Sequence, residues 1–426
     1  MILISISSVS PYINILSNTV FWWIVQLAII YLIISCNKHY IKLNLKNYFF
    51  IVFLIILSLI NFIRGCFLAE NYWDWKNMIN NLMIMLIPFI TFTTSSIKFF
   101  PILTYHYLKY ALPFFFIIVF FIPIDAYGFY LMPVTFFLLF FPILPKKWKI
   151  ITVLFALTVF FADLTARSNV IKFLLPIFFS FIYYLRNIIN KNTFNIIRIS
   201  LFSIPIILFC LAIAGIFNPF EIDKYAKFDV KKIEVDSEGN IREAKITDDT
   251  RTFIYKEVLE TAKRYNTWIF GRSLARGNET QIFKDADLTG RGERYGNEVL
   301  IPNIFTWLGL IGVLIYFLIY YKASYLAIKQ SNNIFSVILG IFIAFRWFYG
   351  WVEDSSRFSL NTFFLWITIG LCYSKEFRGL NNHEVKLWLT SIFNFERTKK
   401  YYKRTIIEII KTKYVIKDNS SSSNLP

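Results

Sequence analysis

The chain has 426 residues, of which 56% are hydrophobic, and its mean hydropathy is +0.53. This composition excludes an ordinary soluble fold, because it is more apolar than a water-facing surface normally permits. The formal net charge of +18 lies in the connections between apolar segments and in the C-terminal tail, as membrane orientation requires, so no nucleic-acid partner is expected.

Apolar segments recur along most of the chain at the length needed to cross a membrane. A helix of about 20 residues spans the ~30 Å hydrocarbon core, so these segments predict a polytopic, all-α transmembrane bundle of 11 to 12 spans. The stretch 1–16 is short and contains Pro11, so we predict a tilted twelfth span there, with an interfacial segment as the alternative. The other predicted spans are 19–36, 47–64, 77–95, 106–123, 126–144, 149–164, 168–185, 197–217, 299–320, 333–350 and 357–374.

The charges alternate from one connection to the next. Short cytoplasmic loops collect Lys and Arg, so the basic connections predict the cytoplasmic side and the acidic or charge-poor ones the opposite side. The basic set is Lys38, Lys42, Lys46, Lys98, Lys109, Lys146, Lys147, Lys149, Arg186, Lys191, Arg198, Lys322 and Lys329. The outward set is Glu70, Asp74, Asp125, Asp163, Glu353 and Asp354.

One long hydrophilic segment, 218–298, interrupts the spans and lies outside by the same alternation. Its middle part, 248–269, has the pattern of an amphipathic helix that Asp249 or Thr250 could cap. The predicted organisation is an N-terminal bundle of eight or nine spans (1–217), the large periplasmic loop (218–298), three further transmembrane helices (299–374) and a basic cytoplasmic tail (375–426). The tail is either a basic helix on anionic lipid or a solvated segment.

The sequence contains no motif of a soluble enzyme and no metal-ligand spacing, so no metal or cofactor is expected. What remains is a set of ionisable side chains in or beside the outward ends of spans. Such charges are costly in a membrane unless they are paired or face an aqueous cavity, which makes each a functional candidate. They are Arg64, Asp163, Arg167, Lys172, Arg346, Arg357 and Glu298.

Two arginines and one acid stand out in this set and in the long loop. Arg167 begins a span and Arg251 lies in the loop's predicted helix. Because guanidinium groups bind pyrophosphate bidentately, an outward site of this kind suits a polyprenyl-pyrophosphate glycan donor. Glu298 stands where the loop re-enters the membrane, where partial desolvation suits a general base.

Several of the candidates also have a plainer interpretation. Arg64 and Lys172 could instead extend their charged groups to the membrane interface. Glu298 could instead form a salt bridge with Arg294 or Arg291. Arg346 could be paired structurally with a carboxylate of the 353–354 pair. Outward tryptophans could stack on sugars or simply anchor the protein at the membrane interface, and these are Trp73, Trp75, Trp268 and Trp351.

Three short motifs follow one another around the long loop. The first is Thr165-Ala166-Arg167-Ser168 at the start of a central span, and the second runs from Arg251 through an amphipathic helix to Ile269-Phe270-Gly271. The third is Glu298 followed by Gly309-Leu310-Ile311-Gly312. With these motifs, the region from about Asp163 to Tyr373 resembles the O-antigen polymerase and O-antigen ligase superfamily of bacterial membrane glycosyltransferases.

This resemblance implies a multi-pass enzyme of the bacterial cytoplasmic (inner) membrane, active on the periplasmic face in lipopolysaccharide biosynthesis. The ligases typically carry a histidine followed by asparagine where this chain has Glu298, and the polymerases commonly carry an acid there. A polymerase is therefore favoured. The alternatives are a ligase acting on a lipid A core or a protein and, from another class, a polysaccharide flippase or transporter.

The polymerase interpretation assigns partners and roles. The donor and acceptor are undecaprenyl-pyrophosphate-linked oligosaccharides, and membrane lipid and a chain-length regulator protein are further expected partners. Glu298 is expected to be the catalytic base. The expected pyrophosphate or substrate ligands are Arg167, Arg251, Arg346, Arg357 and Arg272.

Overall fold

The computed structural model describes residues 1–13, 18–40, 45–162, 167–221, 231–235, 241–245, 251–282 and 290–393. It is 77% helical, which confirms the all-α class. In the described part, the strands form two small antiparallel hairpins, β1 (Lys231–Val235) with β2 (Ile241–Lys245) and β3 (Asn278–Glu279) with β4 (Glu293–Arg294).

The helices before the long loop are α1 (Ile2–Val9), η1 (Ser10–Tyr12), α2 (Thr19–Tyr40), η3 (Leu45–Tyr48), α3 (Phe49–Leu68), α4 (Tyr72–Leu86), η4 (Ile87–Phe89), α5 (Ile90–Thr94), α6 (Phe99–His106), η5 (Tyr107–Ala111), α7 (Leu112–Ile118), η6 (Ile124–Ala126), α8 (Tyr127–Tyr130), α9 (Met132–Leu139), η7 (Phe141–Ile143), α10 (Lys146–Ala162), α11 (Arg167–Ser180), α12 (Ile182–Leu185) and α13 (Lys191–Ile213). The later ones are α14 (Thr252–Tyr265), α15 (Leu300–Lys329), α16 (Ile334–Tyr349), α17 (Leu360–Tyr373), α18 (Lys375–Gly379) and α19 (Asn382–Phe393).

Apolar helices long enough to cross a membrane support a membrane protein. Among the described residues there are 6, and three shorter apolar helices accompany them. The exact number of spans stays a prediction. The six are Thr19–Cys36, Phe49–Leu68, Tyr72–Thr94, Ser168–Leu185, Lys191–Ile213 and Leu300–Lys329, and the shorter ones are Ile2–Tyr12, Ile334–Tyr349 and Leu360–Tyr373.

Prolines account for the places where predicted spans are not single helices. The predicted span 126–144 divides into α8, α9 and η7, with Pro133 in the first turn of α9 and Pro142 in η7. Proline removes an amide donor and clashes with the preceding turn of a helix. The expected full span over 1–16 is not formed by residues 1–13, because the run Ile2–Tyr12 is only about 16 Å long at ~1.5 Å per residue.

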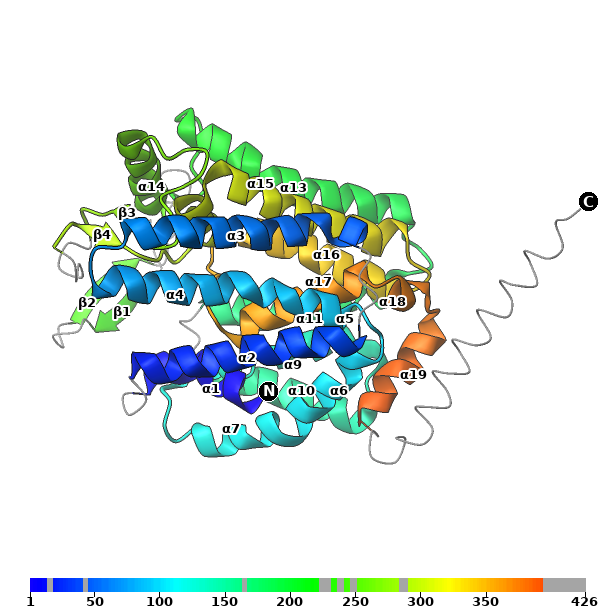
Figure 1. Ribbon diagram of the computed structural model, residues 1–426. Helices are drawn as coiled ribbons and strands as arrows, with labels where there is room; N and C mark the ends of the chain where they lie inside the picture. Colours follow the sequence, from blue (N-terminus) through cyan, green and yellow to red (C-terminus); the bar gives the residue numbers. More distant parts are fainter. Residues whose placement is uncertain are drawn as a thin grey trace, which may run out of the picture.

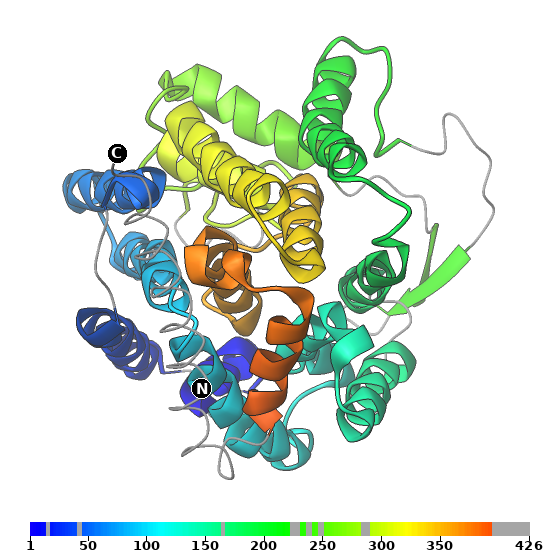
Figure 2. The same ribbon diagram turned by 90° about the vertical axis from the view of Figure 1, so that its right-hand side faces the viewer.

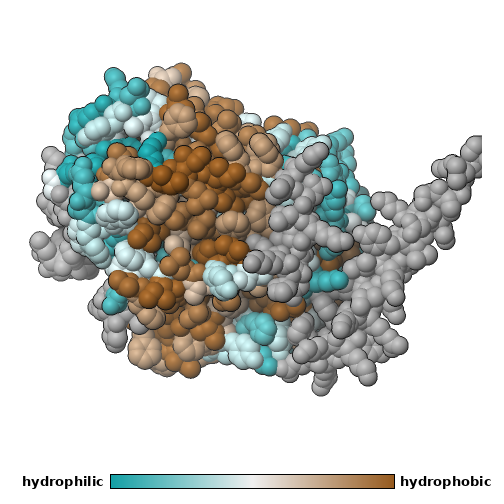
Figure 3. Space-filling model, in the orientation of Figure 1, coloured by the Kyte–Doolittle hydropathy of each residue, from teal (hydrophilic) through white to brown (hydrophobic). Residues whose placement is uncertain are grey.

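The bundle has two hydrophilic ends and an apolar middle. Figure 1 shows α4 lying between α2 and α3, with α14, β3 and β4 at one end and α18 and α19 at the other. Figure 2 views the bundle from the end that carries α19 and shows α17 at its centre, and all residues of α17 are buried. Figure 3 shows a broad apolar band between hydrophilic ends, the surface that a bilayer requires.

Basic side chains at the end that carries α18 and α19 tie together connections predicted to share the cytoplasmic side. These hydrogen bonds confirm that the loops lie at one end, while the side that this end faces stays a prediction. They join Lys322 Nζ to Asn47 O (2.8 Å), Lys191 Nζ to Ser331 O (2.7 Å), Lys329 Nζ to Asn192 Oδ1 (3.0 Å) and Arg378 Nη1 to Gln330 O (2.9 Å).

Candidate functional site

Helix α14 lies within the range where the amphipathic loop helix is expected. It buries Ile254, Val258 and Ala262, a spacing of four residues that places them on one face. The predicted caps, Asp249 and Thr250, lie outside the described residues, and Arg251 occupies the N-cap position. The helix therefore fixes the backbone of Arg251 at its first turn.

The segment after α14 inserts into a break in α15. Gly309 lies inside α15 with a non-helical φ of 67°, and the amide of Leu310 donates to the Trp268 carbonyl at 2.8 Å. A Cβ atom on Gly309 would lie 2.3 Å from the Ile269 carbonyl oxygen, and one on Gly271 would lie 2.6 Å from the Gly309 nitrogen. Glycine is therefore required at both positions, and two motifs noted in the sequence contact each other directly.

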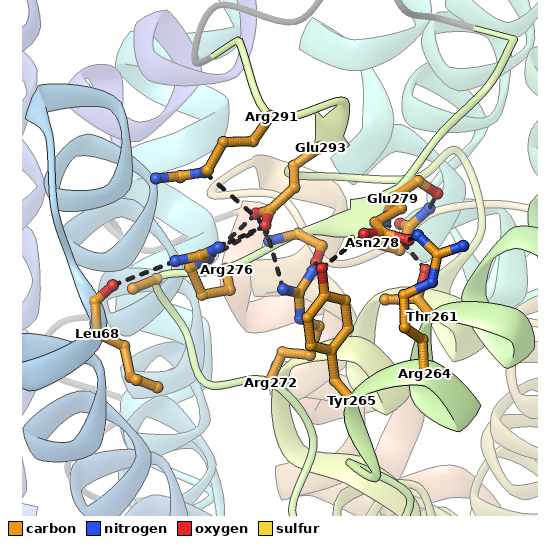
Figure 4. A network of polar contacts seen from close by, with 12 residues as sticks. Leu68, Thr261, Arg264, Tyr265, Arg272, Arg276, Asn278, Glu279, Arg291 and Glu293 are labelled. Carbon is orange, nitrogen blue, oxygen red and sulfur yellow. Dashed lines mark hydrogen bonds and ion pairs between the residues drawn. The ribbon is translucent and has the colours of Figure 1, made fainter.

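A buried carboxylate holds the rest of this loop. Glu293 is 2% exposed and accepts from Arg272 at 3.1 Å and from Arg276 at 2.7 Å (Figure 4). Arg272 also donates to the Gly277 carbonyl at 2.6 Å and stacks on the Tyr265 ring. The Arg272 guanidinium is thus occupied by contacts within the loop. Arg272 lines a hollow of about 610 Å³ beside α14, and not the larger cavity described below. Neither observation favours its expected role as a pyrophosphate ligand.

A second cluster attaches the loop to the start of α4. Asp74 is fully buried and accepts from Arg291 Nη2 and Tyr295 Oη, both at 2.5 Å, while Arg291 Nη1 lies 2.9 Å from Glu70. Burial alone would lower the pKa of Arg291, but the hydrogen bond and charge of Asp74 raise it overall. This pairing joins the acidic connection around Asp74 to the long loop, so both lie on the same side, as the charge alternation predicts.

A cavity of about 810 Å³ opens at this end of the bundle. Its wall combines aromatic rings, amides and charges from the end of α1 and η1, from α2, α4 and α15, from Arg251 at the start of α14 and from the connection after α16. The aromatic set is Tyr12, Trp22, Trp23, Trp73, Phe129, Tyr295, Trp307 and Phe358; the amides are Gln26, Asn77, Asn80, Asn81, Asn297, Asn303 and Asn361; the charged residues are Lys76, Arg251, Arg357, Glu298, Glu353 and Asp354. The size and polarity suit an organic ligand with many hydroxyl groups.

Two of the predicted residues meet at this wall. Arg251 Nη1 lies 2.7 Å from Glu298 Oε2, and Arg251 Nε donates to the Val352 carbonyl at 3.2 Å. Arg294 approaches the other oxygen of Glu298 at 3.5 Å, so the Arg294 salt bridge considered above also forms. The Glu298 side chain is 48% exposed and that of Arg251 21%, which leaves the pair open to a ligand.

The other predicted arginines differ in position. Arg357 lines the cavity, is 62% exposed and pairs with Asp354 at 3.0 Å. Arg346 is buried away from this cavity, and in the described part of the chain it pairs with neither Glu353 nor Asp354. Arg167 begins α11, but its side chain lies outside the described residues.

Sequence reasoning missed the N-terminal wall of the cavity. Residues within 7–12 and 19–23 contribute to it, whereas the hydropathy pattern favoured a transmembrane span over 1–16 and gave no sign of a cavity. Pro11 was the one local signal. Of the four tryptophans considered for sugar stacking, only Trp73 lines the cavity. Trp75 and Trp268 are exposed, and Trp351 stacks on Tyr255.

Lys172 also has a different role from the interfacial one expected for a lysine near a span end. Its Nζ lies 2.8 Å from Glu353 Oε1, with the lysine side chain 2% exposed and the glutamate 20%. The pair therefore links α11 to the connection after α16 beneath the cavity. A lysine and a glutamate so far apart in sequence give no local signal of this contact.

Comparisons with protein-family models, curated proteins and solved structures find no match to this chain. The resemblance to O-antigen polymerases and ligases therefore stays a prediction.

Proposed function

We propose that the protein is a surface-polysaccharide polymerase of the bacterial inner membrane, active on the periplasmic face. It transfers the growing glycan from undecaprenyl pyrophosphate to a new lipid-linked repeat unit. The observation that carries this proposal is the contact between Arg251 and Glu298, 2.7 Å apart, at the wall of a cavity of about 810 Å³. A guanidinium can bind the leaving diphosphate through charge-assisted hydrogen bonds, and a carboxylate can accept the proton of the attacking hydroxyl.

The proposed reaction is an inverting, metal-independent displacement at the anomeric carbon of the donor. The bond between that carbon and the diphosphate oxygen breaks, and its electron pair leaves with undecaprenyl pyrophosphate. The acceptor hydroxyl oxygen forms the new glycosidic bond from the opposite face, and Glu298 takes its proton. Arg251 stabilises the negative charge that develops on the leaving group, and cleavage of the sugar–diphosphate bond supplies the free energy.

The ion pair couples donor binding to activation of the base. In this structure Glu298 neutralises Arg251. A diphosphate carries more negative charge than a carboxylate and matches the guanidinium fork, so it competes with Glu298 for Arg251. The released carboxylate then accepts the proton, while Arg294 holds it at the wall.

The rest of the cavity supports a glycan substrate. Sugar rings present apolar faces and a rim of hydroxyl groups, which match aromatic rings and amides respectively. Trp22 and Trp73 belong to the aromatic part of the wall, and Asn77 and Asn81 to the amide part. The carboxamide of Asn81 is oriented by its hydrogen bond to the Leu274 carbonyl, at 3.0 Å.

The test is polymerisation of lipid-linked repeat units by purified protein. Glu298→Gln should reduce the turnover rate by about 10²–10⁴-fold, the usual contribution of a general base. Glu279→Gln is the matched control, because Glu279 lies in the same loop but pairs with Arg264 outside the cavity. Wild-type chain lengths from Glu298→Gln would remove Glu298 from catalysis.

The same assay separates the remaining interpretations. Activity should persist in EDTA, because charge stabilisation is assigned to Arg251 rather than to a metal ion. Transfer to a lipid A core acceptor, with no elongation of lipid-linked glycan, would identify a ligase. Movement of lipid-linked units across the membrane without any new glycosidic bond would identify a transporter.

A further inference from the structure

Arg346 is a charged side chain buried in the last turn of α16. It lies in α16 between Phe345 and Trp347 and is 6% exposed. Among the described residues its guanidinium has no hydrogen-bond or salt-bridge partner, and its Nε is buried without one. A buried charge in an apolar environment is strongly unfavourable unless a counter-charge lies beside it.

The neighbouring carboxylates already form ion pairs with other cations. Glu353 pairs with Lys172 at 2.8 Å, and Asp354 pairs with Arg357 at 3.0 Å. Both carboxylates act on Arg346 through their charge, but neither is within ion-pair distance of it. Among the described residues, this group thus has three cations, Lys172, Arg346 and Arg357, for two carboxylates, an excess of one positive charge.

A small space in the bundle is lined in part by Arg346. This cavity of about 20 Å³ is lined by Arg346 and Lys172, by the polar side chains of Thr135, Asn361 and Thr368, and otherwise by apolar residues of α9, α11, α16 and α17. About 10–15 Å³ is the minimum for one water-sized occupant. The space is therefore large enough for a single small ion or water molecule and far too small for a diphosphate.

We propose that this cavity is a binding site for one small monovalent anion of the halide class, with chloride as the natural occupant. An anion supplies the missing negative charge, whereas a water molecule does not. Arg346 and Lys172 provide the positive potential, and the carboxamide N–H groups of Asn361 supply the neutral donors, because the hydroxyls of Thr135 and Thr368 already donate to the carbonyls of Met132 and Phe364. The anion joins α11, α16 and α17 beneath the large cavity, so its role is structural and independent of the proposed polymerase activity.

Chloride-dependent stability tests this site. Purified protein in lipid nanodiscs is heated in sodium gluconate, with chloride or bromide replacing gluconate at constant ionic strength. The wild-type unfolding temperature should rise saturably with either halide, and Arg346→Gln should abolish that dependence. Arg186→Gln is the matched control, because Arg186 is an exposed arginine that donates to the Tyr183 carbonyl, and it should keep the wild-type response.

A second measurement does not depend on any variant folding. Crystals of the wild-type protein grown in bromide should show an anomalous peak between Arg346 and Lys172. The absence of that peak, or a stability that responds equally to gluconate and halide, overturns the proposal. Neither result bears on polymerisation, because Glu298 and Arg251 line a different cavity.

Discussion

Charged residues in and beside the large cavity differ mainly in how exposed each ion pair is to a competing ligand. Lys172 and Glu353 form a mostly buried pair, with side chains 2% and 20% exposed. Arg251 and Glu298 form a more open pair, 21% and 48% exposed. Exposed ion pairs contribute little stability, typically about 0–1 kcal/mol. The open pair can therefore exchange partners with a ligand at small cost, whereas the buried pair cannot.

This difference gives a prediction for Arg251. Arg251→Lys keeps the charge but loses the planar fork that reads a diphosphate, so turnover should fall about tenfold or more while the unfolding temperature stays close to that of the wild type. Steady-state assays and thermal unfolding of the same preparation check this. Equal turnover in Arg251→Lys would contradict a bidentate role for Arg251.

In the buried cluster around Glu293, by contrast, substitution should lower the stability of the protein. Glu293→Gln should destabilise the protein by about 3–5 kcal/mol, because it leaves Arg272 and Arg276 without their shared carboxylate in a buried site. Urea unfolding, with limited proteolysis of the long loop, measures the effect. Arg264→Ala, at a side chain 67% exposed, is the control and should change stability by less than about 1 kcal/mol.

At the scale of elements, the insertion of residues 268–272 into the break of α15 couples the loop to the membrane bundle. The Arg272 amide donates to the Thr306 carbonyl at 2.6 Å, before the break, and the Leu310 amide donates to the Trp268 carbonyl at 2.8 Å, after it. The loop thus supplies partners to a helix that is interrupted within an apolar environment. This joins α14 and the start of α15, and hence Arg251 and Glu298, into one rigid unit.

Substitution of the glycine at the break tests this coupling. Gly309→Ala should cost at least about 1–3 kcal/mol, because alanine is strained at a φ of 67° and its Cβ would meet the Ile269 carbonyl. Denaturant unfolding reports the loss. Gly379→Ala is the control, since no atom lies within 4 Å of a Cβ placed there, and equal stability of the two variants would argue against the coupling.

The sequence predicts some elements well and others poorly, for physical reasons. α14 was predictable because its amphipathic pattern is local. The contact between Gly271 and Gly309 was not, because it depends on hydrogen bonds between segments far apart in the chain. The division of 126–144 and the N-terminal wall were also missed, because hydropathy alone does not distinguish a span from short apolar helices broken by proline, as at Pro11 and Pro133.

At the scale of the whole molecule, the apolar band separates two hydrophilic ends (Figure 3), and the two ends carry different structural features. One end carries the large cavity and α14, and the other carries the basic connections. Positive connections stay in the cytoplasm during insertion, so the cavity should face the periplasm. The gathering of basic connections at one end was predictable from the sequence, because the charge pattern is repeated at many loops, and the side that each end faces stays a prediction.

Cysteine labelling tests this orientation. Lys263 in α14 and Lys375 at the start of α18 are both exposed and lie at opposite ends of the bundle. In intact spheroplasts a membrane-impermeant maleimide should label Lys263→Cys and leave Lys375→Cys unlabelled until the membrane is permeabilised. The reverse pattern would place the cavity in the cytoplasm.

The central claim is that Arg251 exchanges Glu298 for the diphosphate of a lipid-linked glycan. Electron cryomicroscopy of the protein with a non-cleavable diphosphonate analogue of the donor measures this directly. The account predicts phosphonate oxygens about 2.7–2.9 Å from Arg251, the glycan beside Trp73, and Glu298 turned away toward Arg294. An analogue bound elsewhere, with the contact between Arg251 and Glu298 intact, would contradict it.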